Sequence, residues 1–154
     1  MALFDAMFEF VDNQAGYAAS TTAFFTAAKT IDWQSTGLEM GSGTPLWINA
    51  RVGTAAFKGG TSIQLVVLGD TAAGGHDASS TEICRGPVVA IGSTTTTAPG
   101  AWICRMPLPS NCDSYRYMGV AIVNDGANTA GTVDCWLDHG PQSSFDTQVT
   151  TSNI

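Results

Sequence analysis

The sequence predicts an all-β protein, a jelly-roll-like antiparallel β-sandwich of about eight short strands. Seventeen glycines and six prolines are spread through the 154 residues and interrupt every window long enough for a stable helix. Several short runs alternate between apolar and polar residues, which is the period of a half-buried strand. No helical stretch is long enough to connect parallel strands, so two packed antiparallel sheets bury this pattern best.

The N-terminal half contains two clear strand patterns. In residues 46–52 the apolar side chains at even positions alternate with Trp, Asn and Arg at odd positions. Residues 61–69 (TSIQLVVLG) begin after two glycines and end before an aspartate. Weaker patterns occupy residues 7–11 and 30–34. We therefore expect four strands in this half of the chain.

The C-terminal half supplies the remaining strands. Residues 101–106 (AWICRM) form an apolar run between two prolines, and residues 82–85 and 88–91 have weaker patterns. The longest patterns, residues 115–124 and 131–137, are separated by a loop that starts with Asp-Gly. Because Asn-Asp-Gly supplies the positive φ angles that a chain reversal needs, we expect these two strands to pair as a hairpin.

The length fits one domain, since 154 residues are enough to bury a core but few for two domains. We expect a single β-sandwich over residues 1–140, with an N-terminal strand or arm. Residues 141–154 are polar and predict a C-terminal tail that orders against a partner or stays disordered. The Thr-, Ala- and Gly-rich segments 71–81 and 92–100 predict surface loops.

The charge pattern argues against nucleic acids and membranes as partners. The net charge is −7, and the six basic residues are scattered, so no basic footprint for phosphates or anionic lipids is present. No apolar stretch approaches the ~20 residues of a membrane span, and the start lacks a positive signal-peptide region, so we expect synthesis in the cytoplasm without export. Only 12% of residues are charged, which suggests that partners cover much of the surface.

Residues suited to catalysis are few. His139 lies beside an aspartate at a strand end, and His76-Asp77 lies in a glycine-rich loop that fits a flexible turn better than a metal site. No nucleophile elbow, phosphate loop or HExxH motif occurs. Two of the thirteen acids could still meet in space as a glycosidase pair, but several lie near turns, where they bond the backbone. We expect no enzyme activity, no cofactor and no metal.

Four cysteines lie mostly in apolar, strand-like runs. No Cys-x-x-Cys pair is present, which argues against zinc. We expect small buried thiols, with disulfides in the mature particle as the alternative. These residues are Cys84, Cys104, Cys112 and Cys135.

Four tryptophans could pack in a core or subunit interface, or form a sugar-stacking platform as in carbohydrate-binding sandwiches. Trp136 alternates with Cys135 and Leu137, so if those two lie in the core, Trp136 faces outward and needs cover from another chain. The same reasoning applies to Trp47. Outward tryptophans in a weakly charged chain predict oligomerisation. The tryptophans are Trp33, Trp47, Trp102 and Trp136.

The order of several short segments resembles the small cement proteins that decorate tailed-bacteriophage heads, of the Bordetella-phage type. Each segment is short, and the resemblance lies in their order and spacing along nearly the whole chain. The four cysteines, the long loop near residues 70–81 and the C-terminal extension depart from the family pattern. The matching segments are 19–22 (ASTT), 30–32 (TID), 43–47 (GTPLW), 105–107 (RMP), 115–120 (YRYMGV) and 130–133 (AGTV).

The resemblance implies a jelly roll, a homotrimer, and binding to the outer face of the major capsid protein where capsomers meet. It also implies a location in the virion, on the capsid surface, and neither catalysis nor a cofactor. The alternative is a β-sandwich adhesion or carbohydrate-binding module of a phage tail or fibre. A different structural virion component and a small hydrolase are more distant alternatives.

Aromatic residues near both ends are the expected contacts with the shell or with other subunits, because chain ends can order on a partner. The competing interpretation is that the phenylalanines pack on their own sandwich. The candidate contact residues are Phe4, Phe8, Phe10, Trp47, Trp136 and Phe145.

Overall fold

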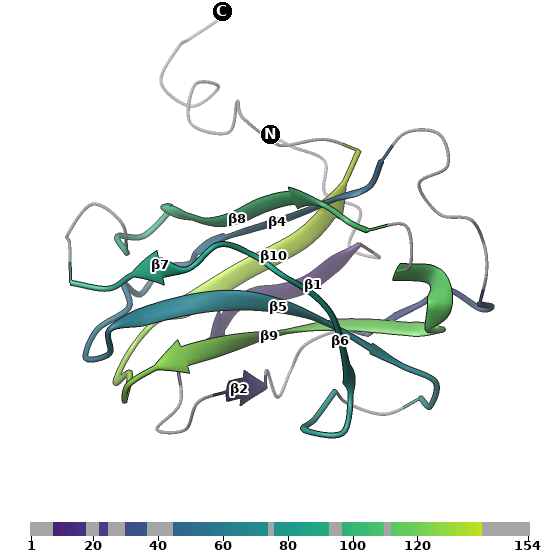
Figure 1. Cartoon of the computed structure of the whole chain (residues 1–154). Coiled ribbons are helices and arrows are strands. Elements are labelled where there is room, and N and C mark those ends of the chain that lie inside the picture. Colours follow the sequence, from purple (N-terminus) through teal and green to yellow (C-terminus); the bar gives the residue numbers. More distant parts are fainter. Residues whose placement is uncertain are drawn as a thin grey trace, which may run out of the picture.

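The computed structural model describes residues 8–17, 22–24, 30–36, 45–73, 76–92, 97–109 and 112–139. Within these residues, strands form two antiparallel sheets that pack face to face, which confirms the predicted all-β class (Figure 1). A short 3-10 turn, η1, spans Cys112–Ser114. The strands are β1 (Glu9–Ala15), β2 (Thr22–Phe24), β3 (Ile31–Asp32), β4 (Trp47–Val52), β5 (Ser62–Asp70), β6 (Thr81–Arg85), β7 (Val89–Ala90), β8 (Trp102–Pro107), β9 (Tyr117–Asp125) and β10 (Thr132–Asp138).

The strand order is that of a jelly roll. One sheet has the order β1-β10-β4-β8, and the other has the order β2-β9-β5-β6. The short strands β3 and β7 pair with β9 and β5, so β2 with β3, and β6 with β7, each share one position in the sheet. The described segments therefore fill the eight positions of two interlocked Greek keys, as the sequence predicts.

The core lies between the two sheets. Burial on this inner side explains why apolar and polar residues alternate along the strands of the four-stranded sheet. In β4, Ile48, Ala50 and Val52 are buried on the inner side, whereas Trp47 and Arg51 are only partly buried on the other. On β10, Val133, Cys135 and Leu137 face the same core. Burial of such side chains stabilises the fold by about 1.5–3 kcal/mol each for the larger ones.

The central strands β5 and β9 are apolar on both faces. Their inner side chains, such as Leu65 and Ile122, join the main core, and both are 0% exposed. Their outer side chains form a second cluster of Val66, Leu68 and Ala121. Because both faces are buried, β5 reads as a continuous apolar run rather than as an alternating one.

The predicted hairpin between the two longest C-terminal strands is wrong. Strand β9 lies in one sheet, between β2 and β5, and β10 lies in the other, between β1 and β4. The connection does not turn tightly, because it runs beside the segment before β5: Thr61 N–H donates to the Asp125 carbonyl and Lys58 pairs with Ala130. Gly126 lies in this connection between the two sheets and has a positive φ, a conformation that glycine adopts without steric cost.

Several expectations concern parts of the chain outside this description. The predicted tail 141–154 and the candidate residues Phe4 and Phe145 lie outside the described residues. Strand β2 has no counterpart among the predicted strands, since its three residues are too few to show a period. Among the described residues, no helix is long and apolar enough to cross a membrane.

Candidate functional site

The outer surface of the four-stranded sheet carries three of the four tryptophans, the fourth, Trp33, being packed against the core. Registers place them in neighbouring rows: Trp47 pairs with Pro107, Trp136 with Asn49, and Trp102 with Arg51. Residues paired across antiparallel strands share a face. We call this surface the aromatic face, made of Trp47, Asn49, Arg51, Trp102, Arg105 and Trp136.

A β-bulge in β8 brings Trp102 and Arg105 to the same face. The register between β4 and β8 shifts between Ala50 and Arg51. At this point Ile103 and Cys104, which are consecutive, are both buried. Without the bulge, residues three apart would point to opposite faces of the sheet. The bulge therefore creates the pair of an indole and a guanidinium on the outer surface.

The side chains of the aromatic face contact one another directly. The rings of Trp102 and Trp136 have centroids 5.8 Å apart and are tilted by 50°. The Arg105 guanidinium lies 4.7 Å from the Trp102 ring centroid, and that of Arg51 lies 5.7 Å from the Trp136 centroid. An aromatic pair of this kind contributes about 0.5–1.5 kcal/mol and an exposed cation–π contact about 0.5–1 kcal/mol. The face is thus ordered by its own contacts.

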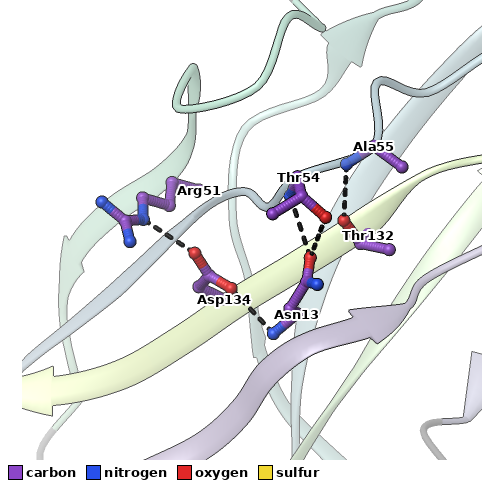
Figure 2. A network of polar contacts seen from close by, with 6 residues as sticks. All are labelled: Asn13, Arg51, Thr54, Ala55, Thr132 and Asp134. Atoms are coloured by element: carbon purple, nitrogen blue, oxygen red, sulfur yellow. Dashed lines mark hydrogen bonds and ion pairs between the residues drawn. The ribbon is translucent and has the colours of Figure 1, made fainter.

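A polar network holds Arg51 in place (Figure 2). Its Nε lies 2.9 Å from Asp134 Oδ2, while Asp134 Oδ1 accepts a 2.8 Å hydrogen bond from the Asn13 N–H. Asn13 Oδ1 in turn accepts from the N–H and the hydroxyl of Thr54, at 2.9 and 2.8 Å. A Cβ atom on Gly53 would lie 2.6 Å from Asn13 Oδ1, so a larger residue there would displace the Asn13 side chain and disturb the network. This network joins β1, β10 and the end of β4.

The network depends on an irregularity in β1. Asn13 has a φ of 49°, a left-handed conformation that asparagine tolerates better than most residues. The pairing of β1 with β10 shifts between Val11 and Gln14, where Asn13 lies. This shift turns the Asn13 side chain toward the end of β4.

The structure places two predicted contact residues away from solvent. Phe10 is 0% exposed and belongs to the core, as the competing interpretation expects, so it is withdrawn as a contact residue. Trp136 faces outward, opposite Cys135, but is only 4% exposed, and its ring contacts Trp102 and Arg51. The expectation that another chain must cover Trp136 is therefore wrong. Trp136 is already buried within its own chain.

Two other predicted contact residues remain accessible. Phe8 is 40% exposed, and its carbonyl accepts a hydrogen bond from the Leu137 N–H, which places it at the margin of the same sheet. Trp47 is partly buried at the start of β4. Trp102 and Arg105 are not among the contact residues predicted from the sequence. Strict alternation places Trp102 and Arg105, which are three residues apart, on opposite faces, so the period of two could not have found this pair.

The aromatic face is locally basic at one border. Strands β4 and β8 contain Arg51 and Arg105 and no acidic residue. The carboxylates of the sheet, such as Asp134 and Asp138, come from β10 and β1. Three of the four arginines pair with carboxylates within 2.6–2.9 Å, whereas Arg105 has no such partner in the described chain. The border formed by β4 and β8 therefore carries positive charge in a chain whose net charge is −7.

Burial lowers the reactivity of the cysteine thiols. All four cysteines are free thiols, and Cys104, Cys112 and Cys135 are buried, as expected for small apolar residues. Burial, together with the neighbouring Cys112 and Glu82, raises the pKa of Cys84 to about 11. Burial likewise raises the pKa of Cys104 to about 12. At neutral pH these thiols are protonated, which makes them poor nucleophiles and metal ligands.

The loop after β5 folds back onto the six-stranded sheet, to which β5 itself belongs, and places one histidine there. The His76 ring packs over Gly119, where a Cβ atom would lie 2.5 Å from Nδ1. Burial, which outweighs the nearby carboxylate of Asp70, lowers the pKa of His76. Within the described residues, no cluster of three or more His, Cys, Asp or Glu side chains is arranged to hold a metal.

An apolar groove of about 550 Å³ lies at one end of the sandwich. It is formed by the segment 56–60 before β5 and by residues after β7 and before β8. Phe57, Ile91 and Pro99 are among its lining residues. It is separate from the aromatic face and contains one charged residue, Lys58.

No protein-family model matches the chain, and no curated protein matches its sequence.

Proposed function

We propose that this chain is a capsid decoration (cement) protein of a tailed bacteriophage. In this proposal it binds the outer surface of the head as a homotrimer and stabilises contacts between capsomers of the major capsid protein. The resemblance in segment order suggests this function, and the aromatic face is the observation that carries it. Tryptophan and arginine are the residue types most enriched at the energetic centres of protein interfaces.

The geometry suits a structural contact. The aromatic face is the outer surface of a sheet, built on β-strands and ordered by ring contacts, so its side chains lose little freedom on binding. A protein that binds only the assembled shell stabilises that shell by mass action. Many copies on a closed lattice multiply a modest affinity per site.

The test measures binding to heads of the phage whose genome encodes the chain, purified without this protein. We expect wild-type chain to cosediment with the heads to saturation. Trp47→Ala should weaken binding by about tenfold or more, because Trp47 belongs to the aromatic face. Tyr17→Ala is the matched control, because Tyr17 is 43% exposed and lies beyond the end of β1. Absence of wild-type binding would refute the proposed function.

Carbohydrate binding by a tail or fibre module is the second candidate. It is favoured by one observation, that Trp47 and Trp102 are only partly buried and lie on the same face of the sheet. Sugars stack on such rings, so a ligand would quench tryptophan fluorescence. Millimolar-range binding on a glycan array, lost in Trp47→Ala together with the quenching, would favour this candidate over the decoration protein.

A further inference from the structure

Among the described strands, β8 lies at the edge of the four-stranded sheet. It pairs with β4, and no described strand lies on its other side. In Figure 1, β8 runs along the upper border of the sandwich, with β4 beside it. The edge of a sheet presents backbone N–H and C=O groups that can accept an added strand.

The backbone of Arg105 points toward the open side. The Leu108 N–H donates to the Leu46 carbonyl, so residues 46 and 108 form a hydrogen-bonded pair. Hydrogen-bonded and non-hydrogen-bonded pairs alternate along antiparallel strands, which makes the pair of Asn49 and Arg105 a non-hydrogen-bonded one. The N–H and C=O of Arg105 are therefore directed away from β4, toward the free edge.

The side chain of Arg105 supplies charge at the same point. It is exposed, stacks on Trp102 at 4.7 Å, and has no carboxylate partner in the described chain. Stacking fixes the plane of the guanidinium while its N–H groups remain available at the rim. A residue added opposite Arg105 would have its Cβ about 5.5 Å or less away on the same face. An acidic side chain at that position would complete the pair.

From these features we infer that β8 is a docking edge for an extended, acidic polypeptide segment. The segment adds antiparallel to β8, exchanges backbone hydrogen bonds with Arg105, and places an Asp or Glu against its guanidinium. The inference rests on the proposed function in taking the partner to be a segment of the capsid shell protein. The absence of acidic residues from β4 and β8 makes the site complementary to such a segment.

Pro107 restricts the register of the added strand. It ends β8 and has no N–H to donate, so pairing cannot extend past it with full hydrogen bonding. The bulge at Ile103 and Cys104 disturbs the ladder on the other side of Arg105. The short regular stretch between these two features centres the added strand on Arg105.

An acidic polysaccharide would use the guanidinium and the indole but not the backbone groups.

The first experiment follows amide resonances of the full-length ¹⁵N-labelled chain by NMR. Three probes are added: an octapeptide of alternating Thr and Glu, its Thr-Lys counterpart, and trigalacturonic acid. We expect the Thr-Glu peptide to shift the Arg105 amide and to slow its hydrogen exchange, and the Thr-Lys peptide to do neither. Arg105→Gln should weaken Thr-Glu binding by about tenfold, as loss of a charged hydrogen-bond partner does.

Arg85→Gln is the matched control, because it removes the same charge from another exposed arginine, paired with Glu82. It should bind the Thr-Glu peptide like wild type. No shift at Arg105, or equal weakening in both variants, would overturn the inference. Binding of trigalacturonic acid in place of the peptide would also overturn it and identify an acidic glycan as the ligand.

The second experiment repeats the head-binding assay with both variants. We expect Arg105→Gln to lose about tenfold in affinity for heads relative to Arg85→Gln. If wild type binds heads and Arg105→Gln binds equally well, the docking edge is wrong while the proposed function holds. If wild type ignores heads but the Thr-Glu peptide docks at Arg105, the proposed function is wrong while the acidic-segment edge holds.

Discussion

Replacing Asn13 separates two contributions to the free energy of unfolding: the hydrogen bonds of its side chain and the strain of its backbone (Figure 2). The side chain accepts two hydrogen bonds from Thr54, and the backbone has a φ of 49°. Asn13→Ala loses both bonds and places a residue with a Cβ and no polar side chain in a left-handed conformation. Asn13→Gly also loses both bonds, but glycine adopts this conformation without steric cost. The difference between the two variants, with the greater freedom of glycine in the unfolded chain taken into account, measures the backbone strain.

The expected magnitudes follow from the structure. Both bonds to Asn13 are at the surface, where water replaces them in part, so their joint loss costs about 1 kcal/mol. A left-handed alanine adds about 1 kcal/mol or more. Glycine instead adds about 0.5 kcal/mol through the greater freedom of the unfolded chain. We therefore expect destabilisation of about 2–3 kcal/mol for Asn13→Ala and about 1–1.5 kcal/mol for Asn13→Gly.

Urea unfolding measures these differences. With a slope of about 2 kcal/mol per molar urea, Asn13→Ala should lower the midpoint by about 1–1.5 M. Thr54→Val, which removes the hydroxyl and keeps the N–H, serves as a control for a single lost bond. If Asn13→Gly is as destabilised as Asn13→Ala, or more so, the argument from the φ angle is refuted.

Three further predictions test the core, the thiols and the loop. Ile122→Ala should destabilise the fold by about 2–5 kcal/mol in urea unfolding, because the side chain is fully buried between the sheets, and a loss below 1 kcal/mol would contradict this core. Native thiols should react with Ellman's reagent at pH 8 far more slowly than urea-unfolded ones, since burial raises the pKa of Cys84 to about 11; equal rates would contradict their burial. Because the pKa of His76 is lowered on folding, the unfolded chain binds more protons near pH 6. The contribution of His76 to the free energy of unfolding should therefore be complete above about pH 6.5 and decrease as the pH falls below it. His76→Gln should remove this part of the slope, and an unchanged slope would show that His76 is not its source.

The alternation of residues 46–52 and the apolar run of residues 61–69 were sufficient to predict the main strands, since their patterns follow directly from burial on one face or two. The hairpin prediction failed because Asp-Gly signals a positive φ but not which strand follows in which sheet. That choice depends on nonlocal pairing, here of Lys58 and Thr61 with the connection.

The candidate site was predictable only in part. The period of two places Trp47 and Trp136 outward, and both lie on the outer face. It does not reveal that Trp102 and Arg51 contact Trp136, because they come from distant parts of the chain. Arg105 shares this face through a bulge that a strict alternation cannot express.

The most direct test of the proposed function is the mass measured by light scattering, first for the purified chain and then for heads lacking it after the chain is added. The proposal predicts a particle of three times the 16.0 kDa chain mass, and heads whose mass rises to a plateau at a fixed number of copies and whose melting temperature increases. A monomer that leaves both the mass and the melting temperature of the heads unchanged would contradict it.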